Sequence, residues 1–82
     1  MSHTPHELAE EFPNQIQALH ALKLTDVHFN RLADEYHELN REIHRIETDV
    51  EPTSDHILEE KKKLRLGLKD QIAVMLNKAQ PE

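Results

Sequence analysis

Apolar side chains recur at alternating steps of three and four residues from Phe29 to Val50, and this spacing constrains the fold more than any other feature. Such a heptad pattern is typical of an α-helix that packs against another helix along a single stripe. No proline interrupts the stretch, so we predict one long helix over residues 26–50. The residues of this first stripe are Phe29, Leu32, Tyr36, Leu39, Ile43, Ile46 and Val50.

A turn is expected directly after this helix. Pro52 cannot continue a helix, because it lacks the amide hydrogen and its ring clashes with the preceding turn. Thr53 or Ser54 then offers a hydroxyl group that can cap the next helix. We therefore predict a turn over residues 51–54 and a second long helix over residues 55–78.

The second long helix carries a matching apolar stripe, and a tail over residues 79–82 follows it. Folded antiparallel on the first helix, this stripe places Ile57 opposite Val50 and Met75 opposite Leu32. The sequence therefore predicts an antiparallel helical hairpin that resembles a two-stranded coiled coil. The residues of the second stripe are Ile57, Leu64, Leu68, Ile72 and Met75.

The N-terminal part is predicted to be helical in short pieces. A proline-bounded segment covers residues 1–13, a short helix is expected over residues 14–24, and Thr25 or Asp26 can cap the long helix that follows. One glycine and no cysteine in 82 residues leave little for β-turns and exclude disulfides and thiolate zinc sites. We expect an all-α fold in a single small domain over residues 1–82.

Several apolar side chains lie off the hairpin seam and would stay partly exposed to water in an isolated hairpin. Because a chain this short buries only a modest core, we expect the short helix that ends at residue 24 to cover one flank of the hairpin and a second copy to cover another. This arrangement predicts a homodimeric helical bundle. Gly67 in the second long helix is either a tolerated glycine or a point where another helix approaches closely. The candidate interaction surface comprises Leu58, Leu66, Val74, Leu76, Ile16 and Leu19.

Histidines and carboxylates crowd the stretch over residues 34–47. His37 and His44 lie seven residues apart, about 10 Å along a helix axis, so they cannot hold one metal ion without help from another chain. Most of these positions face away from the seam, which favours a solvated helix face. A histidine and carboxylate metal-binding bundle is the third function considered, and no metal or cofactor is predicted.

The basic run over residues 61–65 suggests an alternative function, a regulator associated with nucleic acid. In the antiparallel register, however, this Lys61–Arg65 face lies beside Glu42, Glu47 and Asp49. The net charge of -6 also opposes binding to nucleic acid or to an anionic membrane. The chain has neither a glycine-rich phosphate loop nor a cysteine nucleophile, so we predict no enzymatic activity and no catalytic residues.

The cytoplasm is the predicted compartment. The first residues show neither the basic leader nor the apolar run of a secretory signal. No apolar run approaches the roughly 20 residues that a bilayer requires, so we expect no association with a membrane.

Four stretches of the predicted hairpin are shared with a known family. They are His28-Phe29, the block over residues 35–40, the block over residues 43–47 and the turn over residues 52–55. Through them the chain resembles the YdcH family of small bacterial proteins, from about Phe12 to Leu76. The family is named as a domain of unknown function. The resemblance implies a short cytoplasmic helical protein, and it supplies neither catalytic residues nor a ligand. The chain departs from the family at His56, where a glutamate would complete a capping box with Thr53.

These observations predict a small cytoplasmic coiled-coil protein that acts by protein–protein interaction. We expect it to associate with itself, with a dimer favoured, and to present a helical surface to a partner protein that the sequence does not identify.

Overall fold

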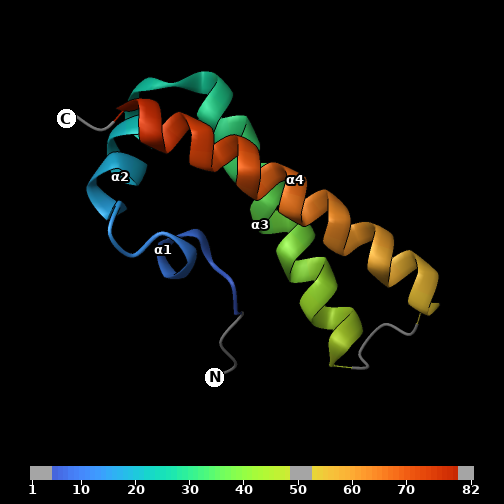
Figure 1. Ribbon diagram of the computed structural model, residues 1–82. Coiled ribbons are helices and arrows are strands. Elements are labelled where there is room, and N and C mark those ends of the chain that lie inside the picture. The colour runs from blue at the N-terminus through green and yellow to red at the C-terminus, as the bar shows by residue number, and fades with distance from the viewer. Residues whose placement is uncertain (1–4, 49–52, 80–82) are drawn as a thin grey trace.

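The computed structural model describes residues 5–48 and 53–79, and four helices occur within these ranges (Figure 1). They are α1 (Leu8–Glu11), α2 (Ile16–Thr25), α3 (Val27–Glu47) and α4 (Asp55–Ala79). No strand occurs in the described ranges, which confirms the predicted all-α fold. Val50 of the first stripe, residues 51 and 52 of the predicted turn and residues 80–82 of the tail lie outside the described residues.

The two long helices α3 and α4 form an antiparallel pair (Figure 1). Each begins at a side-chain cap: Asp26 accepts a hydrogen bond from the Phe29 amide at 3.0 Å, and Ser54 accepts one from the Ile57 amide at 3.2 Å. Such caps satisfy donors that the first helical turn leaves unpaired, and each typically contributes about 1 kcal/mol. Among residues 5–48 and 53–79, no helix combines the length and the apolar character that a membrane-spanning segment requires.

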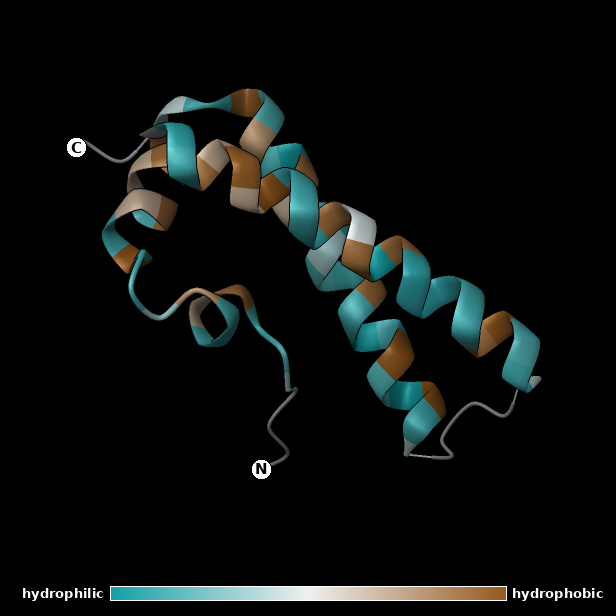
Figure 2. Ribbon diagram, viewed as in Figure 1, coloured by the Kyte–Doolittle hydropathy of each residue, from teal (hydrophilic) through white to brown (hydrophobic). Residues whose placement is uncertain are grey.

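The core gathers where α1 and α2 fold over one end of the α3–α4 pair. The helix α2 contacts both long helices, and apolar segments of α2, α3 and α4 meet at this end (Figure 2). The residues of this core are Leu8, Leu19, Phe29, Leu32, Ala33, Tyr36, Ile72 and Leu76. Because burial of a large apolar side chain contributes roughly 1.5 to 3 kcal/mol, the N-terminal helices complete a core that the hairpin alone would lack.

On α3, the buried face is rotated away from the predicted stripe. Its buried residues are Phe29, Leu32, Ala33, Tyr36, Asn40 and Ile43. Leu39 and Ile46, which the heptad pattern places in the seam, are only half-buried. The rotation is toward Ala33 and Asn40, because Ala33 lies in the core with Leu8 and Leu19 and the Asn40 side chain bonds the Pro5 carbonyl.

On α4, the predicted stripe is only partly covered. Ile72 is fully buried and Leu68 and Met75 are half-buried, whereas Ile57 and Leu64 are exposed. The two helices diverge toward the ends at Glu47 and Asp55 (Figure 1), and a continuous coiled-coil seam requires helices that stay close at a small crossing angle. In the single chain, α3 therefore does not cover these two side chains, and Ile57 is 46% exposed and Leu64 62% exposed.

The six residues of the candidate interaction surface divide into two groups. Leu19 and Leu76 are buried, at 6% and 0% exposure, because α2 folds back over both long helices. They belong to the core of the single chain, which corrects their assignment to the candidate interaction surface. The other four are Leu58, which is half-buried, and Leu66, Val74 and Ile16, which are exposed.

Candidate interaction surface

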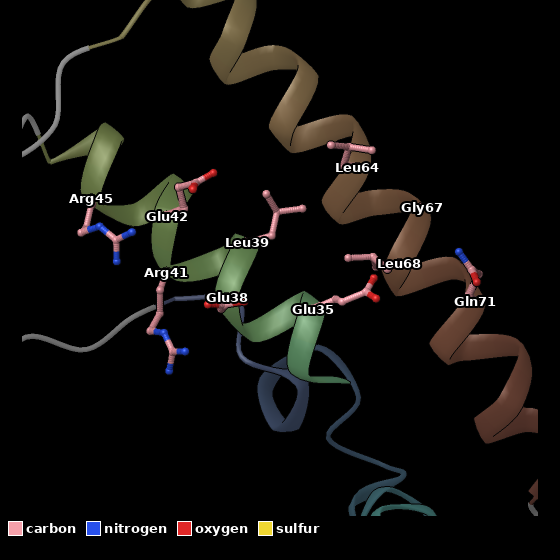
Figure 3. A pocket seen from close by; sticks show the side chains of 10 residues that line it. All are labelled: Glu35, Glu38, Leu39, Arg41, Glu42, Arg45, Leu64, Gly67, Leu68 and Gln71. Carbon is pink, nitrogen blue, oxygen red and sulfur yellow. The ribbon is translucent and has the colours of Figure 1, made fainter. Parts of the chain in front are cut away.

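A groove with a volume of about 610 Å³ lies between α3 and α4 (Figure 3). Leu39 points from α3 toward α4, and Leu64 and Leu68 point back from α4 toward α3. The groove is lined by Glu35, Glu38, Leu39, Arg41, Glu42, Arg45, Leu64, Gly67, Leu68 and Gln71. It therefore places residues of both predicted stripes at an open surface of the hairpin.

The floor of this groove is apolar although it faces solvent. Leu64 is 62% exposed, and Leu39 and Leu68 are half-buried. Gly67 lies on the same side of α4, and a Cβ atom added there would meet no atom within 4 Å. A glycine in a helix interior costs about 1 kcal/mol relative to alanine. No close packing within the described chain compensates for that cost at Gly67.

Charged side chains of both signs stand on the α3 rim of the groove. Glu35, Glu38 and Arg41 are exposed, and Arg41 extends away from α4 (Figure 3). Glu42 forms an ion pair with Lys61 of α4 across the hairpin. A rim that mixes both signs can meet a similarly mixed surface without net repulsion.

The other side of the hairpin is closed by the residues that precede α1. The Tyr36 hydroxyl donates a hydrogen bond to the His6 backbone carbonyl at 2.6 Å, and the Asn40 side-chain amide donates one to the Pro5 backbone carbonyl at 2.8 Å. The side-chain oxygen Oδ1 of Asn40 in turn accepts a hydrogen bond from the Arg65 guanidinium of α4 at 2.9 Å. Burial raises the pKa of Tyr36 to about 12, so the phenol remains a donor at neutral pH. These contacts hold the N-terminal residues against both long helices.

Ion pairs reinforce this closed side. Lys69 Nζ lies 2.7 Å from Glu11 Oε1, and the hydrogen bond from Lys69 lowers the pKa of the Glu11 carboxyl. His37 Nδ1 lies 2.9 Å from Glu7 Oε2. The histidine-rich stretch of α3 thus supplies a polar contact to the N-terminal segment.

The structure brings no metal-ligand group together from the described residues. His37 contacts Glu7, and His44 lies seven residues further along α3. Within residues 5–48 and 53–79, no three histidine, aspartate or glutamate side chains lie close enough to share one ion.

The basic run over residues 61–65 is mostly engaged with neighbouring side chains. Lys61 pairs with Glu42, Lys62 pairs with Glu47 at 2.9 Å, and Arg65 donates to Asn40 at 2.9 Å. The hydrogen bond from Lys62 lowers the pKa of Glu47. Lys63 is more exposed than the paired Lys61 and Lys62, with 75% of its side chain accessible to solvent. Its Nζ lies 3.9 Å from Glu60 Oε1. Most of the positive charge on this face is therefore matched within the hairpin.

Asn40 is a structural residue that the sequence analysis did not identify. It lies next to the heptad stripe and is polar, so its pattern resembles that of a solvated position. Ala33 precedes it by seven residues and therefore lies on the same side of α3. A small residue followed by a side-chain amide seven positions later, as in Ala33 and Asn40, is the sequence signal that another segment of the chain packs on that side of the helix.

Comparisons with known proteins identify the family of the chain. No curated protein and no solved structure matches it. A family model described as a protein of unknown function, DUF465, matches residues 29–76, which span most of α3 and α4 and both walls of the groove. This range is more than half of the 82 residues, and the YdcH family that the sequence resembles is part of DUF465. The chain therefore belongs to the DUF465 family.

Proposed function

We propose that this protein acts by protein–protein interaction and that copies of it associate through the groove between α3 and α4. The observation that supports this most directly is the apolar floor formed by Leu39, Leu64 and Leu68, which faces solvent in the single chain. Burial of such apolar surface against another chain removes it from water and stabilises the complex. The associated copies would then present their remaining helical surfaces to a partner protein.

The charges around the groove favour a second copy as its occupant. Two chains of net charge -6 repel each other overall, but the rim carries Glu35 and Glu38 together with Arg41. A two-fold axis sets a patch against an identical patch. A patch with both signs can therefore pair with its copy, whereas a patch with a single sign would repel it.

The other functions considered have less support. The Lys61–Arg65 face would have to release its contacts with Glu42, Glu47 and Asn40 to engage a nucleic acid. A metal-binding bundle has no ligand group among the described residues. We propose a role without catalysis, with the cytoplasm as its compartment.

Sedimentation equilibrium of the purified chain with and without Leu64→Glu tests this proposal. The wild-type chain should be dimeric at micromolar concentrations. Leu64→Glu should be monomeric, because its carboxylate would be buried without a partner in an apolar contact. The helical circular dichroism signal should be retained, since Leu64 is 62% exposed in the single chain. A wild-type chain that stays monomeric would contradict the proposal.

Leu66→Glu is the matched control. Leu66 is also an exposed leucine of α4, at 57%, but it lies on the closed side beside Lys62 and Lys69. This variant should dimerise as the wild type does. Equal loss of association in both variants would show that added negative charge acts generally and that the groove is not the interface.

A further inference from the structure

We propose that two copies of the chain pack with their α4 helices antiparallel and crossing at Gly67, where the two backbones come into contact. The inference rests on the self-association proposed above and adds the geometry of the contact. It assigns Gly67 a role at the interface between two copies of this chain.

Nothing within the described chain requires glycine at position 67. Its backbone does not adopt a positive φ angle, so another residue could adopt the same conformation. A Cβ atom added there would meet no atom within 4 Å. Because glycine is a poor helix former, a residue with a side chain would stabilise the single chain. The space above Gly67 therefore points to a neighbour from outside the chain.

The position of Gly67 suits a crossing point between two equal helices. It is the central residue of the 25-residue helix α4, so a two-fold axis at Gly67 lets the two helices overlap along their whole length. Leu64 and Leu68 flank it on the groove. With no side chain between the backbones, the helices can approach closely and the leucines of each copy can pack against the other.

The charges at the two ends of α4 favour the antiparallel orientation. The helix has Asp55 in its first turn, Glu60 soon after, and Lys78 in its last turn. An antiparallel crossing brings the acidic end of one helix toward the basic end of the other, and it aligns the two backbone dipoles favourably. A parallel crossing would place like charges side by side.

Substitution of Gly67 tests the close crossing. By sedimentation equilibrium, Gly67→Ala and Gly67→Val should weaken the dimer by roughly 10- to 100-fold, since added side-chain atoms must fit between packed backbones. Glu59→Ala, at an exposed position of the same helix, should leave the dimer unchanged. In the Leu64→Glu background, Gly67→Ala should raise the urea midpoint, because alanine favours the helix when no second chain is bound.

Engineered cysteines test the orientation. The chain contains no cysteine, so single substitutions give unambiguous disulfides. Glu60 and Val74 each lie seven residues from Gly67, on opposite sides, and an antiparallel crossing sets one opposite the other. A mixture of Glu60→Cys and Val74→Cys chains, oxidised in air, should form mainly the mixed disulfide.

The outcomes separate this inference from the proposed function. A dimer that keeps its affinity in Gly67→Ala, or Glu60→Cys chains that link only with each other, would overturn the crossing and leave self-association in place. A monomeric wild-type chain would overturn both.

Discussion

Replacing Asn40 with alanine is predicted to destabilise the chain by about 2 kcal/mol. Asn40 is 1% exposed, donates to the Pro5 carbonyl at 2.8 Å and accepts from Arg65 at 2.9 Å. A hydrogen bond from a charged donor contributes roughly 1.5 to 3 kcal/mol and a neutral one about 1 kcal/mol. Alanine offsets about 0.5 kcal/mol of this loss through its higher helix propensity. Water can bind the exposed parts of the Pro5 carbonyl and of Arg65 after the substitution, so the net loss stays near the lower end of the summed range, about 2 kcal/mol.

Urea denaturation followed by far-ultraviolet circular dichroism measures this loss. All variants should be compared at one protein concentration, because self-association makes the midpoint depend on concentration. For a domain of this size, the same loss lowers the Tm by roughly 8 to 16 °C. Asn77→Ala is the control, since Asn77 is exposed and accepts only a 3.3 Å hydrogen bond from Gln15. Its free energy of unfolding should change by less than about 0.5 kcal/mol.

A double-mutant cycle with Arg65→Met isolates the bond between Asn40 and Arg65. We expect a coupling energy of roughly 1 to 2 kcal/mol, because the two side chains are in direct contact. A loss below about 0.5 kcal/mol in Asn40→Ala, or a coupling energy near zero, would refute the reasoning that this buried amide joins the N-terminal residues to both long helices.

Three further predictions concern the closed side. Because burial raises the pKa of Tyr36 from 10.0 to about 12, the unfolded chain ionises first as pH rises, and stability is lost between pH 10 and pH 12. Tyr36→Phe should lack this loss when urea midpoints are compared across that range, with lysine titration common to both proteins. The pKa of Glu11 is lowered by Lys69, so the contribution of this pair is present above the ordinary pKa of 4.5 and disappears as pH falls below it. The stability difference between wild type and Lys69→Met should therefore shrink as pH falls below 4.5, and a constant difference would contradict it. His6 has a φ of 64°, so His6→Gly should raise the Tm by roughly 4 to 8 °C through relief of about 1 kcal/mol of backbone strain, and an unchanged Tm would show that this strain is negligible.

The two long helices could be predicted from the sequence because the features that indicate them lie within short stretches of residues. The apolar recurrence over α3 and the absence of proline from α4 are both properties of short windows of sequence. The caps are local as well, since Asp26 and Ser54 each bond an amide three residues later. Such features do not depend on how the rest of the chain packs.

The buried faces could not be predicted in the same way, because they depend on how many segments share each helix. A heptad pattern assumes one partner per helix, and on that assumption Leu39 faces Leu68 and Ile43 faces Leu64. In the structure, α2 and the N-terminal residues also pack on the hairpin. Leu76 and Asn40 are therefore buried, and Leu64 is left at the open groove.

The two sides of the hairpin differ in chemistry, and this difference favours the groove as the interface between copies. On the closed side, Tyr36, Asn40 and Arg65 form hydrogen bonds that direct the N-terminal segment to one position. On the groove side, Leu39 and Leu64 have no polar group that needs a partner, so a second chain can cover them without leaving a buried donor or acceptor unpaired. A two-fold pair sets the groove of one copy against the groove of the other, so this contact uses both grooves and does not extend into a longer assembly. The N-terminal segment thus completes the core and occupies the opposite side of the hairpin, which favours the groove for the proposed association.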